Sequence, residues 1–202
     1  MVDGVARLAA YHRRDGAEPL RLPLLVVVSG VPGGGKTTLA RRLAAELRLP
    51  HLNRDLVRDG IWATDGVNAG PATWDVWMAA VKLYLQHRVS LVVDQTMYRG
   101  LSDVTIAREL APISLLVNVH VEASNARERF AARITADVRG APYLDQALAR
   151  FDEILGEVAD PMDFGGAHLV VDTTEPTFPI EPLARRVWEA AMSLHHLREA
   201  EP

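Results

Sequence analysis

The sequence predicts an α/β fold in which a central parallel sheet of five strands lies between two layers of helices, as a three-layer sandwich. Apolar, β-branched runs alternate along the chain with amphipathic helical segments, and this alternation favours parallel strands joined by helices. The runs are apolar at nearly every position, which is typical of strands covered on both faces. Polar side chains follow directly after the runs, where ligands bind in such sheets.

The expected elements follow from these two periodicities. The apolar runs predict strands at 23–29, 50–53, 89–94, 113–121 and 168–173. Helical periodicity predicts helices at 36–47, from Arg54 onward, and at 72–87, 101–110, 123–138, 144–157 and 180–197.

The domain organisation expected from this order is a single domain over 22–202, preceded by an arm or short helix at 1–21. A small helical lid is expected at about 123–143. Trp74 and Trp77 share one face of the helix at 72–87, so we expect them to pack in the core rather than to stack on a substrate.

Composition narrows the functional class. The chain has 202 residues, is 49% hydrophobic and carries a formal net charge of −4, so no global basic field favours nonspecific nucleic-acid or membrane binding. Cysteine is absent, which excludes disulfides and thiolate metal sites. No signal peptide and no apolar run of the ~18 residues needed to span a bilayer are present, so we expect a cytoplasmic protein.

A glycine-rich motif follows the first strand directly. Residues 30–38 read GVPGGGKTT, and the spacing Gly30, four residues, Gly35, Lys36, Thr37 is that of the P-loop, or Walker A, nucleotide-binding motif. The helix expected behind it would direct its N-terminus at the same point, which adds to the attraction for a polyphosphate.

Each residue type in this motif suits one part of a phosphate site. Lys36 is expected to reach the β- and γ-phosphates of a nucleotide, Thr37 to bind Mg²⁺, and Thr38 to contact the α-phosphate. Glycines allow the backbone to curve so that N–H groups point inward and form an anion nest. The nest glycines are Gly30, Gly33, Gly34 and Gly35.

Two carboxylates follow other strands of the expected sheet. Asp55 comes after the second strand, where a hydroxyl nucleophile would need a proton acceptor, although an aspartate there could also simply cap the helix. Asp94 ends the third strand, where a carboxylate can hold Mg²⁺ directly or through water.

Three segments, GVPGGGKTT, LNRDLVRDGIW and VVDQTMYRG, together resemble the kinase domain of polynucleotide kinases and related small-molecule kinases of the chloramphenicol phosphotransferase and zeta-toxin types. The resemblance covers residues 23–175 and implies a P-loop NTPase fold and transfer of the γ-phosphate of ATP to a hydroxyl. It implies that Asp55 is the general base and that Arg58, one helical turn on, holds the acceptor. In these relatives the position of Asp94 often orients the acceptor.

The loop after Asp94 and the arginines of the expected lid are further candidates. Thr96 and Tyr98 are plausible acceptor contacts, although a solvated loop explains them equally well. The resemblance suggests that the lid closes over ATP and brings positive charge to the phosphoryl group. Its arginines, which could equally form a solvated mixed-charge face, are Arg127, Arg129 and Arg133.

The leading hypothesis is therefore an ATP- and Mg²⁺-dependent kinase that acts on a small molecule or a nucleic-acid end. Two alternatives remain open: a kinase specific for polynucleotide 5′-hydroxyls, and a nucleotide-dependent ATPase or switch that acts through a protein partner. Residues 56–80 and 97–103 are expected to select the acceptor.

Overall fold

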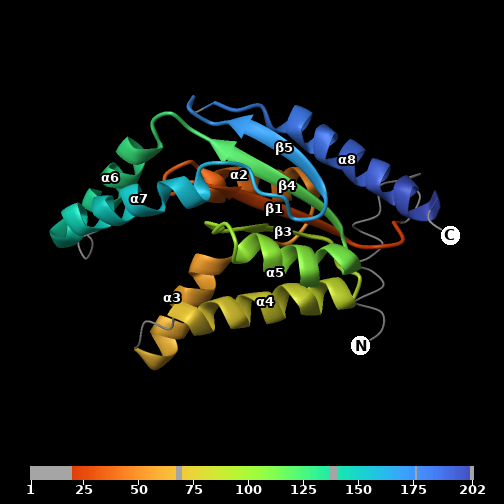
Figure 1. Cartoon of the computed structure of the whole chain (residues 1–202), viewed down its shortest axis with the longest axis horizontal. Coiled ribbons are helices and arrows are strands. Elements are labelled where there is room, and N and C mark those ends of the chain that lie inside the picture. The colour runs from red at the N-terminus through yellow and green to blue at the C-terminus, as the bar shows by residue number, and fades with distance from the viewer. Residues whose placement is uncertain (1–19, 67–69, 137–140, 176, 201–202) are drawn as a thin grey trace.

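The computed structural model describes residues 20–66, 70–136, 141–175 and 177–200, and its centre is a five-stranded parallel sheet (Figure 1). The strand order is β2-β3-β1-β4-β5, so the strand that carries the glycine motif lies in the middle. This is the P-loop NTPase fold expected from the sequence. The expected N-terminal arm at 1–21 lies outside the described residues up to residue 19.

The three central strands are buried, the two edge strands are partly exposed, and every pair is parallel. β1 (Leu24–Gly30) pairs with β3 (Leu91–Asp94) on one side and β4 (Leu115–Glu122) on the other. β2 (His51–Asn53) and β5 (Ala167–Asp172) form the two edges. The carboxyl ends of the strands therefore meet along one edge of the sheet, where the polar residues of the sequence gather.

β3 begins two residues later than expected. Arg88 adopts a left-handed conformation (φ 60°), and the Val89 N–H donates to the Tyr84 carbonyl, so these residues terminate the preceding helix. The Ser90 hydroxyl then accepts a hydrogen bond from the Leu24 N–H at 2.9 Å. Apolar character alone could not separate this helix-ending turn from the strand that follows.

Helices α2 (Lys36–Leu47) and α8 (Ile180–Ala200) cover one face of the sheet. Residues 24, 26 and 28 of β1 face this layer, as the two-residue period of a strand requires. They pack against Leu39 and Leu43 of α2 and against Leu183 and Val187 of α8. This core fixes α2 and hence the position of the phosphate loop that precedes it.

Helices α4 (Gly70–Gln86) and α5 (Ser102–Glu109) cover the opposite face, and α3 (Arg54–Asp65) packs beside α4. A short 3-10 turn, Ala111–Ile113, follows α5. Trp77 is fully buried in this core and Trp74 packs against it, which confirms their expected packing role.

Helices α6 (Ala126–Ala136) and α7 (Leu144–Val158) project from the carboxyl edge of the sheet as a hairpin (Figure 1). α6 lies within the range of the expected lid, about 123–143, whereas α7 follows that range. A 3-10 turn at Ala141–Tyr143 precedes α7. The hairpin has its own small core, which includes Phe151 of α7 and also Val31 of the phosphate loop. Residues 137–140 of the expected lid lie outside the described residues.

Candidate active site

The phosphate loop joins β1 to α2 and packs tightly against its neighbours. Gly33 has φ +77°, and a Cβ there would lie 2.1 Å from the Ala126 carbonyl oxygen of α6. Gly35 occupies the N-cap of α2 in a left-handed conformation and has no side chain to cap the helix. The first N–H groups of α2 therefore remain directed at the loop, as an anion site requires.

Lys36 begins α2, and its ammonium lies over the loop. Its Nζ donates a hydrogen bond to the Val31 carbonyl at 2.8 Å, and the residue is 8% exposed. Burial lowers the pKa of Lys36 to about 8, an effect that Asp94 and Asp55 oppose and that Arg133 reinforces. The loop thus holds a cation whose charge is only partly compensated by the protein.

Asp94 ends β3 beside the first turn of α2 and is 1% exposed. The Thr37 hydroxyl donates to its Oδ2 at 2.6 Å, Asn53 Nδ2 donates to the same oxygen at 2.8 Å, and His51 Nε2 lies 2.5 Å from Oδ1. Burial alone would raise the pKa of Asp94, but the hydrogen bonds from His51, Thr37 and Asn53 outweigh it and lower the pKa. The carboxylate is therefore held ionised.

The oxygens of Thr37 and Asp94 fit Mg²⁺, which prefers oxygen ligands and keeps several waters beside substrate phosphates. The Thr37 hydroxyl donates a hydrogen bond to Asp94 and accepts a longer one from Asn53 Nδ2 at 3.4 Å, so one lone pair of its oxygen remains for a cation at the phosphate loop. Within the described ranges, no group of three or more His, Cys, Asp and Glu side chains could hold a metal ion by itself.

Asp55 lies in the first turn of α3, but Asn53 is the residue that caps this helix. The Asn53 Oδ1 accepts the Leu56 N–H at 2.9 Å, so the first turn does not need Asp55 as its cap. Asp55 is exposed and accepts a hydrogen bond from Arg58 at 3.0 Å, one helical turn away. Arg58 also contacts Asp59 at 3.1 Å. The structure thus brings Asp55 and Arg58 together.

Trp62 lies in the same helix, seven residues beyond Asp55 and 50% exposed. Seven residues make almost two turns of an α-helix, so the two side chains share one face about 10 Å apart. Trp62 is not among the site residues predicted from the sequence, although its helical register with Asp55 could have identified it as a candidate.

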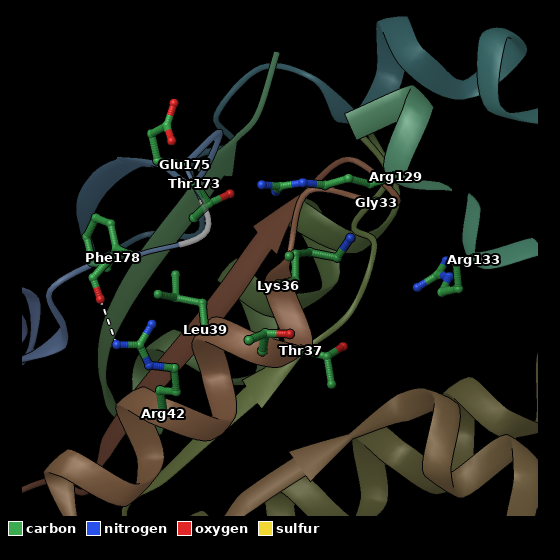
Figure 2. A pocket seen from close by; sticks show the side chains of 12 residues that line it. Gly33, Lys36, Thr37, Leu39, Arg42, Arg129, Arg133, Thr173, Glu175 and Phe178 are labelled. Carbon is green, nitrogen blue, oxygen red and sulfur yellow. Dashed lines mark hydrogen bonds between the residues drawn. The ribbon is translucent and has the colours of Figure 1, made fainter. Parts of the chain in front are cut away.

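A pocket of about 430 Å³ opens above the N-terminus of α2 (Figure 2). At one end the Arg42 guanidinium donates to the Phe178 carbonyl at 2.7 Å. Thr173, after β5, donates its hydroxyl proton to the Gly34 carbonyl at 2.6 Å and so ties the last strand to the phosphate loop. The lining residues are Gly33, Gly35, Lys36, Thr37, Thr38, Leu39, Arg42, Arg129, Arg133, Thr173, Glu175 and Phe178.

The three arginines of α6 have different surroundings. Arg129 lines the pocket and donates to the Thr174 carbonyl at 2.6 Å, and Figure 2 shows its side chain reaching across toward Thr173. Arg133 also lines the pocket and lies over the Phe130 ring at 5.4 Å. Arg127 is exposed and instead forms two 3.0 Å hydrogen bonds with Asp152 of α7. It does not line the pocket.

Thr96 and Tyr98 follow β3 but do not line this pocket. Both are half-buried, and Tyr98 packs against the core of the α6–α7 hairpin. Its backbone N–H donates to the Ser102 hydroxyl at 3.1 Å and so helps to start α5.

Comparisons with known proteins place these features in a family. Residues 25–154 match a family model described as an AAA domain (AAA_33). The chain belongs to this family of AAA domains. The matched part of the AAA_33 chain includes the phosphate loop, α3 and its Asp55, Asp94 and most of the α6–α7 hairpin. No curated protein matches the chain.

Solved structures similar to this AAA_33 chain show the same fold. A protein from Chloroflexus aurantiacus J-10-fl, described as a candidate kinase, is 23% identical with a TM-score of 0.68, and the match covers 84% of this chain and 99% of that one. A gluconokinase from Sinorhizobium meliloti 1021 is 19% identical with a TM-score of 0.54 and coverage of 89% and 97%. A sugar kinase from Janibacter sp. HTCC2649 is 19% identical with a TM-score of 0.55 and coverage of 85% and 98%.

The helices in the described part of the chain are all too short or too polar to cross a membrane.

Proposed function

We propose that this protein is a Mg²⁺-dependent kinase that transfers the γ-phosphate of ATP to a hydroxyl group of an acceptor. The observation that carries the proposal is the pairing of two half-sites at the carboxyl edge of the sheet. Lys36, Thr37 and Asp94 form a phosphate and cation site, and the charge of Asp55, in the first turn of α3, partly opposes the lowering of the Lys36 pKa by burial. A carboxylate facing the terminal phosphate is what proton transfer from an attacking hydroxyl needs.

On the donor side, the charge and position of each residue determine its proposed role in binding the ATP phosphates. The backbone N–H groups of the loop and the Lys36 ammonium would bind the β- and γ-phosphates. Arg129 and Arg133 would stabilise the charge that spreads over the phosphoryl oxygens during transfer. Mg²⁺, held through Thr37 and Asp94, would neutralise part of the phosphate charge. The resemblance to kinases and the pocket lined by Lys36, Arg129 and Arg133 support these assignments.

On the acceptor side, Asp55 would accept the hydroxyl proton as the new oxygen–phosphorus bond forms and ADP leaves. Arg58 already contacts Asp55 at 3.0 Å, so it can hold the carboxylate in place or turn to bind the acceptor. The exposure of both side chains supports an acceptor site open to solvent before the acceptor binds.

Replacing Asp55 tests the proposed base. Asp55→Asn keeps the shape and removes the proton acceptor, so we expect turnover to fall roughly 10²- to 10⁴-fold while ATP affinity stays within about twofold. Transfer from labelled ATP and isothermal titration with a non-hydrolysable ATP analogue measure the two quantities. Asp59→Asn is a matched control, because Asp59 contacts the same Arg58 from the next turn. Normal turnover in the Asp55 variant would remove Asp55 from this role.

A panel of acceptors tests the reaction class. Oligonucleotides with 5′-hydroxyl ends, nucleosides, sugars and hydroxylated antibiotics would be incubated with labelled ATP. Label transferred to any of them supports the kinase and identifies the acceptor class. Slow hydrolysis without transfer to any acceptor would favour an ATPase or switch.

A further inference from the structure

The position of Asp94 depends on a histidine that the proposed reaction does not itself use. Thr37 and Asn53 both donate to Oδ2 of Asp94, at 2.6 and 2.8 Å. His51 approaches the other oxygen, Oδ1, at 2.5 Å. Among the hydrogen bonds that the described residues make to Asp94, His51 thus provides the one to Oδ1.

The register of the sheet brings these side chains together. β2 pairs with β3 so that Asn53 lies opposite Asp94, and side chains of directly paired residues point to the same face. His51 precedes Asn53 by two residues and therefore shares that face. A shift of β2 by one residue would turn both donors away from Asp94. The contact is consequently fixed by the pairing of an edge strand.

One hydrogen bond on each oxygen fixes the plane of a carboxylate. The terminal torsion of an aspartate is broad, so donors on one oxygen alone leave the carboxylate free to rotate about that contact. With His51 on Oδ1, the plane is set and Oδ2 stays directed at the Thr37 hydroxyl. The Thr37 hydroxyl then continues to donate to Asp94, and the lone pair that Asn53 does not occupy stays directed toward the phosphate loop.

We propose that His51 is a positioning residue that sets the Mg²⁺ affinity of the nucleotide site by orienting Asp94 and, through it, Thr37. The inference rests on the proposed use of Mg²⁺ by this site. This role needs only an N–H on Nε2 of His51, which the neutral Nε2–H tautomer and the charged ring both provide. His51 would touch neither nucleotide nor acceptor. Loss of such an outer ligand contact typically lowers metal affinity 10- to 100-fold.

The test compares two substitutions of His51 by isothermal titration. His51→Phe keeps a ring of similar size and removes the donor, whereas His51→Gln keeps an N–H at nearly the same reach. Each is titrated with the non-hydrolysable analogue AMP-PNP, once with Mg²⁺ and once with EDTA. We expect the gain in affinity due to Mg²⁺ to fall about 10-fold in His51→Phe and to recover in His51→Gln, with affinity in EDTA unchanged.

Controls separate positioning from simple structural damage. His87→Phe makes the same chemical change at an exposed histidine outside the site and should leave both titrations unchanged. A normal Mg²⁺ gain in His51→Phe would overturn the proposal. An equal loss of affinity with and without Mg²⁺ would also overturn it, because it would indicate collapse of the loop. If no acceptor is ever phosphorylated but the Mg²⁺ gain still depends on His51, only the kinase proposal fails.

Discussion

Lys36 is a buried side chain whose positive charge a bound anion would stabilise. Its Nζ donates a hydrogen bond to the Val31 carbonyl, and burial lowers the pKa of Lys36 to about 8. A triphosphate at the loop would favour the charged form and raise that pKa. As the pH rises above 8, the free protein would therefore lose the Lys36 charge, whereas the complex would keep more of it.

This linkage predicts that nucleotide binding takes up a proton at alkaline pH. Titration with AMP-PNP at pH 8.5 in two buffers of different ionisation enthalpy should show proton uptake, and affinity should fall as pH rises above 8. The chain has one other lysine, Lys82, which pairs with Glu109, so Lys82→Met should keep the uptake. Equal enthalpies in both buffers would contradict the prediction.

At the scale of elements, the phosphate loop and α6 approach so closely that a glycine is needed between them. A Cβ on Gly33 would lie 2.1 Å from the Ala126 carbonyl and 2.9 Å from the Phe130 backbone nitrogen. Gly60 offers the opposite case, because it lies within α3 and a Cβ there meets nothing within 4 Å.

Two alanine substitutions should therefore change stability in opposite directions. Gly33→Ala places a side chain at φ +77° against backbone, so we expect a loss of about 1–3 kcal/mol in the free energy of unfolding and weaker nucleotide binding. Gly60→Ala should gain about 0.5–1 kcal/mol, since alanine favours the helix. Urea unfolding of both variants measures the difference. A stable Gly33→Ala protein with normal binding would mean that α6 yields at this contact.

At the scale of the whole molecule, a hydrophobic core on each face of the sheet joins it to its helices, and a buried polar network links the sheet to the segment after α7. His120 of β4 is 1% exposed, contacts the Ser29 hydroxyl at 3.2 Å and lies 2.7 Å from the Ala159 carbonyl. Burial lowers the pKa of His120, against the smaller opposing effect of the Ala159 hydrogen bond. The folded protein therefore favours the neutral ring.

Acidification should accordingly destabilise the fold through His120. Below a pH of about 6.5 the unfolded chain binds a proton at this ring before the folded protein does, so the free energy of unfolding falls. Melting temperatures at pH 7.5 and 5.5 would show a larger drop for the natural protein than for His120→Gln. His87→Gln, at an exposed position, should behave like the natural protein. Equal drops in all three proteins would assign the acid sensitivity to other groups.

How far the sequence predicts this molecule depends on the range of the interaction. The β-branched runs and the glycine motif are local signals, and the structure confirms the strands and the P-loop fold they predict. The contacts of His51 and Asn53 with Asp94 arise from strand order, which no local pattern contains. In the sequence, Arg127 cannot be distinguished from Arg129 and Arg133. Its different role follows from the packing of α6 on α7, which pairs Arg127 with Asp152.

Trp62 gives the site an optical property. The Trp62 indole is half exposed and lies on the face of α3 that carries Asp55. Its fluorescence emission should therefore change when a molecule binds at that face, whereas Trp77 is buried in the core. Emission from the native protein, compared with that of Trp62→Phe, would then report an acceptor before any chemistry occurs. Candidate acceptors could then be ranked by their effect on the tryptophan fluorescence. This measurement needs no labelled nucleotide and no knowledge of which hydroxyl reacts.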